Sequence, residues 1–99
     1  MILFKPQKNR EMKNKLYAKV VTLEGGYKKE QETIRTHHKI GDIFEVTYME
    51  MGSWHTDVYE GDEYYNSVYF EFFADAECTQ PIDIYEDPDF NPYKRVVIC

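Results

Sequence analysis

Long hydrophobic runs are missing from this sequence. Its apolar start, Met1 to Phe4, is followed at once by Lys5 and Pro6. A membrane-spanning helix needs roughly 18–20 mostly apolar residues, and a signal peptide needs an apolar segment of about 7–15 residues. The sequence shows neither pattern, so it predicts a cytoplasmic protein without a membrane segment.

Cysteine is scarce as well. The chain has two cysteines, Cys78 and Cys99, and their spacing matches no zinc site. Disulfides belong mainly to secreted proteins, and nothing in the sequence indicates secretion. We therefore expect two free thiols rather than a disulfide, although the two residues could pair.

Lys and Arg are absent from the whole stretch 41–93, which holds fourteen Asp or Glu. Residues 1–40 have the opposite balance, with ten Lys or Arg and four Asp or Glu, and the full chain has a formal net charge of −6. This segregation has two interpretations. The acids form either a solvated surface that faces the basic N-terminal part or an anionic face that competes with nucleic acid for a basic cleft.

Enzyme motifs are missing too. There is no glycine-rich phosphate loop and no nucleophile motif, and Ser53 and Ser67 have no paired His-Asp pattern. His55 and Asp57 share one face of an expected strand and could begin a metal site, but their spacing matches no known one. The sequence therefore predicts a protein that binds rather than catalyses, with no cofactor and no metal.

Aromatic residues are what the chain has in excess, with nine Tyr and six Phe among 99 residues. Large rings favour half-buried, pleated surfaces, and this length suits one domain with one core. We expect residues 1–14 to be an appendage and residues 15–99 to form a single β-barrel-like domain.

Alternating apolar residues and turn signals predict the strands. The first strand spans 15–24, and Gly25-Gly26 favours a hairpin turn after it. The return over 27–36 is ambiguous, because Lys28-Lys29-Glu30 also suits a helix. Further strands are expected at 43–51, 54–60, 64–73, 82–85 and 94–98.

This spacing predicts an all-β fold, a small five- to six-stranded barrel of the SH3-like or OB-like kind. An open sheet with one short packed helix is the alternative. Val68, Phe70 and Phe72 are the expected core face of the strand over 64–73.

Several segments in the region from Lys39 to Tyr93 resemble small uncharacterised proteins of phages and prophages of Firmicutes. They are Lys39–Val46, Met49–Thr56, Tyr65–Phe72, Ile82–Tyr85 and Asp87–Tyr93. The resemblance implies a phage setting rather than an activity. Small acidic phage proteins include inhibitors of host defence, so it also implies an anti-defence, anti-CRISPR-like role as one candidate.

The candidate binding residues combine one tryptophan, one tyrosine and eight acids. They are Trp54, Asp57, Tyr59, Glu60, Asp62, Glu63, Asp83, Glu86, Asp87 and Asp89. Alternate carboxylates on a strand lie roughly 6–7 Å apart, which approximates the phosphate spacing of nucleic acid. The expected partner is thus a host protein with a basic surface or nucleic-acid groove. Trp54, with Met49 and Met51, is either an exposed anchor for that partner or core packing beside a turn.

Two other functions stay open. The basic N-terminal run could bind single-stranded nucleic acid, with Tyr17 stacking on a base; its bases are Lys5, Lys8, Arg10, Lys13, Lys15 and Lys19. Alternatively, the protein is a structural or assembly component of a phage particle. The sequence leaves the oligomeric state open.

Overall fold

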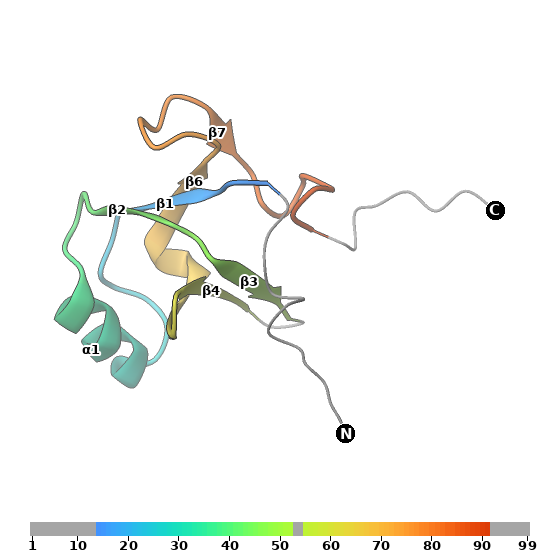
Figure 1. The fold of residues 1–99 in the computed structure, drawn as a ribbon. Helices are drawn as coiled ribbons and strands as arrows, with labels where there is room; N and C mark the ends of the chain where they lie inside the picture. Colours follow the sequence, from blue (N-terminus) through green and yellow to red (C-terminus); the bar gives the residue numbers. More distant parts are fainter. Residues whose placement is uncertain (1–13, 53–54, 92–99) are drawn as a thin grey trace, which may run out of the picture.

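Two antiparallel sheets and one α-helix make up the residues that the computed structural model describes, which are 14–52 and 55–91 (Figure 1). In chain order the elements are β1 (Tyr17–Val20), α1 (Lys28–His37), β2 (Ile43–Glu45), β3 (Tyr48–Met51), β4 (Thr56–Glu60), β5 (Glu63–Asn66), the 3-10 helix η2 (Ser67–Tyr69), β6 (Phe70–Phe73) and β7 (Pro81–Ile82). The prediction of a mostly β fold, with one short helix as the added possibility, is confirmed. The described strands form two sheets and no closed barrel.

The four-stranded sheet has the order β2-β1-β6-β7. Its central strand β1 follows the expected alternation, since Leu16, Ala18 and Val20 are completely buried. Ala18 lies opposite Phe44 of β2 on one side and Phe72 of β6 on the other. A small residue between two large rings lets both rings enter the core.

The second sheet is a meander of β3, β4 and β5. The strand expected over 43–51 proves to be two strands, β2 and β3, one in each sheet. The Val46 amide donates to the Leu16 carbonyl (2.8 Å), whereas the next amide, that of Thr47, donates to Tyr59 (2.9 Å). Consecutive residues thus pair with different sheets, which an alternating pattern along one strand does not reveal.

A similar corner divides the strand expected over 64–73. The Asn66 side chain accepts a hydrogen bond from the Val68 amide (3.1 Å), which caps η2 and ends the extended backbone of β5. This turn leaves Val68 50% exposed and buries Tyr69 instead, so the expected core position of Val68 is wrong. Phe70 and Phe72 are buried as expected.

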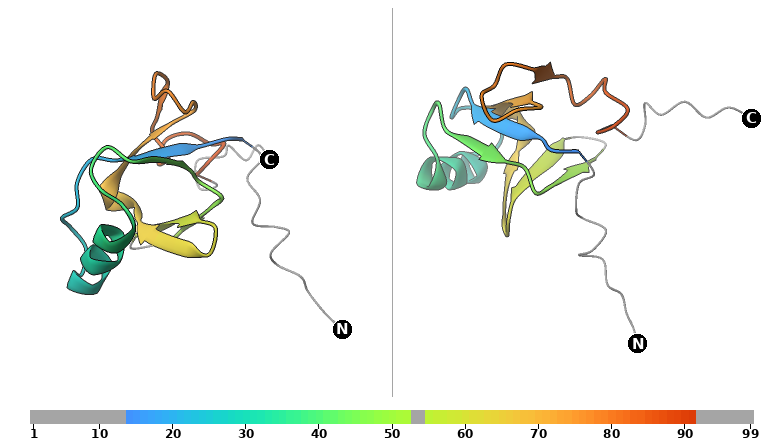
Figure 2. Two further views of the ribbon diagram at one scale, coloured as in Figure 1. Left: turned by 60° about the vertical axis from the view of Figure 1, so that its left-hand side comes forward. Right: turned by 45° about the horizontal axis from the view of Figure 1, so that its top comes forward.

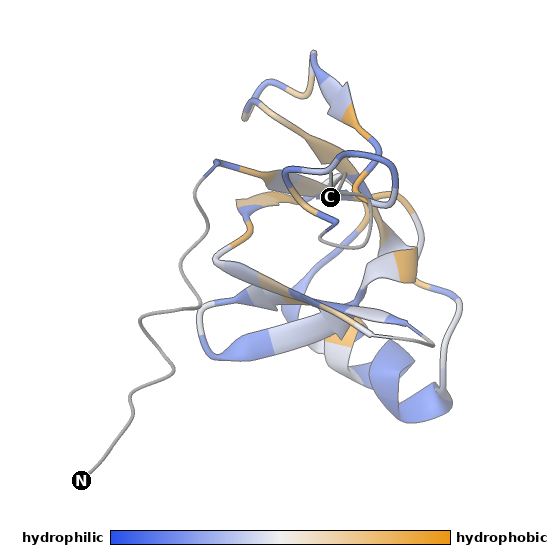
Figure 3. Cartoon of the chain, turned by 90° about the vertical axis from the view of Figure 1, so that its right-hand side faces the viewer, coloured by the Kyte–Doolittle hydropathy of each residue, from blue (hydrophilic) through white to orange (hydrophobic). Residues whose placement is uncertain are grey.

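A helix, α1, replaces the return strand of the expected hairpin. Gly25 and Gly26 have φ angles of 122° and 69°, a region that favours glycine, and they lead the chain into the helix. The Glu30 side chain then accepts a hydrogen bond from the Tyr27 amide (2.9 Å) at the helix start. All of α1 is described, and Ile34 is its one buried residue, which agrees with the hydrophilic surface of the helix in Figure 3.

One hydrophobic cluster joins both sheets, α1 and the segment after β7. Its buried members include Leu16, Ile34, Val58, Phe70 and Ile84. The strand expected over 82–85 is shorter than predicted, because β7 ends at Ile82 and Ile84 packs into the cluster from a turn. The last expected strand, over 94–98, lies outside the described residues.

Candidate functional site

The predicted binding residues fall into two groups in the structure. Trp54 lies outside the described residues. The hairpin group is on β4, β5 and the turn between them, and the C-terminal group is in the segment that follows β7. The hairpin group is Asp57, Tyr59, Glu60, Asp62 and Glu63; the C-terminal group is Asp83, Glu86, Asp87 and Asp89.

The C-terminal group is part of a turn-rich segment. The Asp83 side chain accepts a hydrogen bond from the Tyr85 amide (3.0 Å), and the Asp87 side chain accepts one from the Asp89 amide (2.9 Å). Short acidic side chains often stabilise turns in this way. Hydrogen bonds to the local backbone therefore already account for the acids at Asp83 and Asp87.

In the hairpin group, Glu60 differs from its neighbours because it contacts the interior. Its carboxylate oxygen Oε1 lies 2.7 Å from Nε2 of His38 and accepts a hydrogen bond from the Tyr65 hydroxyl (3.3 Å). Burial raises the pKa of Tyr65, and the charge of Glu60 raises it further, which keeps the hydroxyl protonated as a donor. Glu60 thus connects β4 to the C-terminal end of α1.

His38, which caps that end of α1, lies between two carboxylates. Its Nδ1 is 3.0 Å from Oδ2 of Asp42, while its Nε2 contacts Glu60. The ring stacks on Phe44 with centroids 4.9 Å apart, and its side chain is only 10% exposed. The hydrogen bond from His38, followed by one from the Lys39 amide, lowers the pKa of Asp42.

Three tyrosines form a row on the three-stranded sheet. Tyr48, Tyr59 and Tyr64 lie opposite one another in the strand register, and both neighbouring ring pairs have centroids 5.3 Å apart. Tyr64, at the end of the row, is 55% exposed. Tyr59 was predicted from the sequence. Its two neighbours were missed, because strand pairing alone brings them together.

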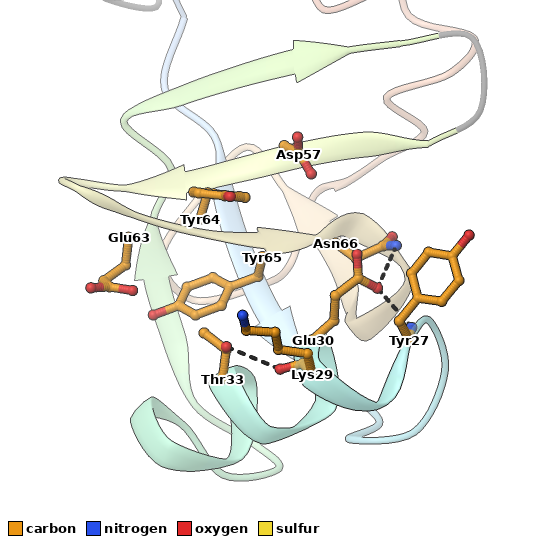
Figure 4. A pocket seen from close by; sticks show the side chains of 9 residues that line it. All are labelled: Tyr27, Lys29, Glu30, Thr33, Asp57, Glu63, Tyr64, Tyr65 and Asn66. Atoms are coloured by element: carbon orange, nitrogen blue, oxygen red, sulfur yellow. Dashed lines mark hydrogen bonds between the residues drawn. The ribbon is translucent and has the colours of Figure 1, made fainter.

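A groove of about 530 Å³ lies between α1 and the β4–β5 hairpin (Figure 4). The views of Figure 2 show the helix on the outside of the fold, and α1 contacts β5. "The groove" below means this site, which is lined by Tyr27, Lys29, Glu30, Thr33, Asp57, Glu63, Tyr64, Tyr65 and Asn66.

Carboxylates dominate the charge of the groove. Among its described lining residues, Glu30, Asp57 and Glu63 are acidic and Lys29 is the one base. Partial burial raises the pKa of Asp57, and His55 opposes this rise, while Glu50 and Glu30 increase it. Two further acids thus act on the same carboxylate, against the larger opposing effect of His55.

Aromatic rings flank these acids. Tyr27 is 78% exposed and lies at one end of the groove in Figure 4, and Tyr64 lies on the strand side between Asp57 and Glu63. The sequence predicted Asp57 and Glu63 but missed Tyr27, Glu30 and Lys29. Their segment was expected to be a return strand, and helical spacing is what turns Lys29 and Thr33 toward the hairpin.

The other candidate sites predicted from the sequence involve residues of which the structure describes only a part. Of the basic N-terminal run, Lys15 and Lys19 are described, and Lys15 pairs with Glu45 (3.3 Å). Met49 and Met51 pack against the core, which favours packing over an exposed anchor for these two. His55 lies 3.3 Å from Asp57, and no third metal ligand joins them among the described residues.

The comparison with protein families identifies the kind of protein that carries this fold and groove, which is a small phage protein. Residues 15–96 match the model of the family described as Bacteriophage T4 protein Y07B. The match covers most of the chain, so the chain belongs to this family. The expected phage setting is confirmed, while the Firmicutes origin and the limited extent of the resemblance stay predictions.

No curated protein and no solved structure was found to match the chain. In the part of the chain that the structure describes, no helix is both long and apolar enough to span a membrane. The family match and the geometry of the groove are therefore the observations on which a function is proposed.

Proposed function

We propose that this phage protein is a non-enzymatic binding protein of the bacterial cytoplasm, which docks an acidic, tyrosine-rich face onto a basic site of a host protein. The groove is the observation that supports this proposal. It combines exposed tyrosines with three carboxylates in one concave site, and stretch 41–93 adds further acids without any Lys or Arg.

The two kinds of residue have separate roles in such an interface. Acids at the rim accelerate encounter with a basic surface and discriminate against acidic proteins. Tyrosines supply most of the buried area and lose little conformational entropy, so they hold the complex once it has formed. Tyr64 and Tyr27 are the anchors, and Asp57 and Glu63 are the steering charges.

The phage setting favours one class of host partner. A basic site in a host protein is commonly a groove that binds nucleic acid. A protein that occupies such a groove blocks the nucleic acid, which makes an anti-CRISPR-like inhibitor or another nucleic-acid mimic the favoured form of this function.

Capture of host proteins on the immobilised full-length chain tests the proposal. The capture is made at low and at moderate salt, and retained proteins are identified by mass spectrometry. We expect a basic host protein that binds at low salt, weakens as salt rises and is released by a competing oligonucleotide. The double variant Asp57→Lys with Glu63→Lys should abolish its retention.

The matched control reverses two charges at exposed positions outside the groove, by Glu77→Lys and Asp89→Lys. This variant has the same net charge as the first but an unchanged groove, so it should retain the partner with at most a modest loss. Equal loss in the two variants would mean that overall charge alone causes binding. That result, or capture of no basic protein, contradicts the proposal.

A further inference from the structure

The groove has a charge that its own residues do not balance. Its described lining holds three carboxylates, and Lys29 is the one base among them. Glu63 lies 4.0 Å from His37 and Asp57 lies 3.3 Å from His55, but histidine is counted as neutral at pH 7, and Lys29 forms no ion pair with a described residue. A cationic guest would therefore complete the charge balance of the groove.

Asp57 is the carboxylate of the groove that a bound cation would stabilise most. It lies on β4 beside Asn66 of β5, and its side chain is 23% exposed. Burial raises its pKa, and the carboxylates of Glu50 and Glu30 raise it further against the opposing effect of His55. The ionised form of Asp57 is thus destabilised in the free protein, and a bound cation would remove this destabilisation.

The aromatic residues restrict what kind of cation fits. Tyr64 and Tyr27 line the groove and are 55% and 78% exposed, and the Tyr64 ring also packs against Tyr59 with centroids 5.3 Å apart. A guanidinium is planar, stacks on aromatic rings, sheds water more easily than an ammonium and donates two parallel hydrogen bonds to a carboxylate. A metal ion would use the carboxylates but not the stacking on aromatic rings, and an anionic ligand would use neither.

We infer that the groove is a receptor for an arginine side chain presented by the protein partner, with the guanidinium paired to Asp57 and stacked on Tyr64. This inference rests on the proposed function and names the chemistry that the basic partner must offer. The volume of about 530 Å³ exceeds that of one side chain, so the groove has room for neighbouring residues of the partner as well.

Lys29 acts as an internal competitor in this arrangement. Its side chain runs along α1 at the groove, below the Tyr65 ring, as Figure 4 shows. An incoming guanidinium is repelled by this ammonium and has to move it aside. Removal of the charge at position 29 should therefore strengthen binding of a cation, whereas it would weaken binding of an anion.

Nuclear magnetic resonance with short peptides on the full chain tests the inference directly. The probe is a blocked Gly-Arg-Gly peptide, compared with Gly-Lys-Gly and with Gly-citrulline-Gly. Citrulline has the shape of arginine without its charge. We expect the arginine peptide to shift the amide signals of Glu30, Asp57, Tyr64 and Asn66 saturably, the lysine peptide to bind several-fold more weakly, and the citrulline peptide to cause no saturable shift.

Single-residue variants show which side chains of the groove bind the arginine peptide. Asp57→Asn should weaken the arginine peptide about 3–10-fold, and Lys29→Gln should strengthen it about twofold or more. The matched control Asp89→Asn changes the charge equally but lies in the C-terminal segment, so its affinity should equal that of the wild type. The amide spectrum of each variant shows whether it remains folded.

Three outcomes would overturn the inference: shifts that map outside the groove, equal binding of the citrulline peptide, or equal losses in Asp57→Asn and Asp89→Asn. Groove shifts caused by an oligothymidylate and weakened by Lys29→Gln would identify a nucleic-acid ligand instead. These outcomes differ from failure of host-protein capture, since a partner can be retained by another face while the arginine peptide fails to bind.

Discussion

The contact of His38 with Glu60 allows a quantitative prediction about what holds α1 to the sheets. Nε2 of His38 and Oε1 of Glu60 are 2.7 Å apart, and Asp42 contacts the other ring nitrogen at 3.0 Å. Both partners are carboxylates, whose oxygens only accept hydrogen bonds. Through these two contacts the His38 ring bridges the end of α1, β4 and the turn before β2.

His38→Phe preserves the ring that stacks on Phe44 but removes both polar contacts. A hydrogen bond to a charged group contributes about 1.5–3 kcal/mol. Because the Glu60 side chain is 38% exposed, the lower part of that range applies to its bond. We therefore expect His38→Phe to reduce the free energy of unfolding by about 2–3 kcal/mol, equivalent to a fall of roughly 10–20 °C in Tm.

A double-mutant cycle separates the bridge from other effects of the substitutions. Glu60→Met alone should cost about 1.5–3 kcal/mol, since Tyr65 also loses its acceptor. The double variant replaces a polar pair by an apolar pair, so its cost should be smaller than the sum of the single costs by about 1–2 kcal/mol. Urea denaturation followed by circular dichroism at neutral pH gives all four free energies.

The neighbouring histidine provides the matched control. The His37 side chain is 39% exposed, and its Nε2 is 4.0 Å from the Glu63 carboxylate, so His37→Phe should cost less than about 1 kcal/mol. Additivity of the His38 and Glu60 variants within about 0.5 kcal/mol would refute the bridge. A His37 variant as damaging as the His38 variant would refute it as well.

Three further predictions concern the same part of the molecule. Ile34→Ala should reduce the free energy of unfolding by about 2–4 kcal/mol, because it removes the buried side chain of α1, whereas Ile40→Ala, at a 62% exposed position, should change it by less than about 0.5 kcal/mol; thermal denaturation compares the two, and equal effects would contradict the packing. Folding raises the pKa of Asp57 above its usual value of 3.8. The protonated carboxyl therefore favours the folded state fully below pH 3.8, and this contribution is lost as the pH rises through the folded pKa. Asp57→Asn should stabilise the chain by about 0.5 kcal/mol at pH 7 and leave its stability unchanged near pH 3. Asp42 has the opposite sign, since its pKa is lowered by the hydrogen bond from His38: Asp42→Asn should destabilise the chain at pH 7, and urea titrations should show this difference disappearing as the pH falls through the folded pKa of Asp42. A pH-independent difference in either variant would contradict the corresponding sign.

The sequence predicted the elements whose pattern is local. Leu16, Ala18 and Val20 alternate because β1 has one buried face, and periodicity alone reports that. The corners at Thr47 and Ser67 could not be predicted in the same way. At Thr47 the backbone partner changes from one sheet to the other between consecutive residues. At Ser67 the alternation itself breaks, since Val68 is exposed and Tyr69 is buried, and both changes depend on distant residues.

The candidate site was predictable in part for the same reason. Asp57 and Glu63 stood out because they belong to a stretch without bases, which is visible in the sequence. Lys29 and Glu30 did not stand out, since their segment suited a strand and a helix about equally. The choice of helix depends on Ile34, which has to reach a core that is built by residues far away in the chain.

One consequence of the way α1 is held concerns the evolution of this family. A helix with Ile34 as its one buried position, all of its residues being described, can change almost any other side chain without disturbing the core. That helix is also one wall of the groove. Substitutions on it therefore alter what the groove accepts at little cost in folding, and a phage that meets a changed host protein can adjust its binding surface one residue at a time.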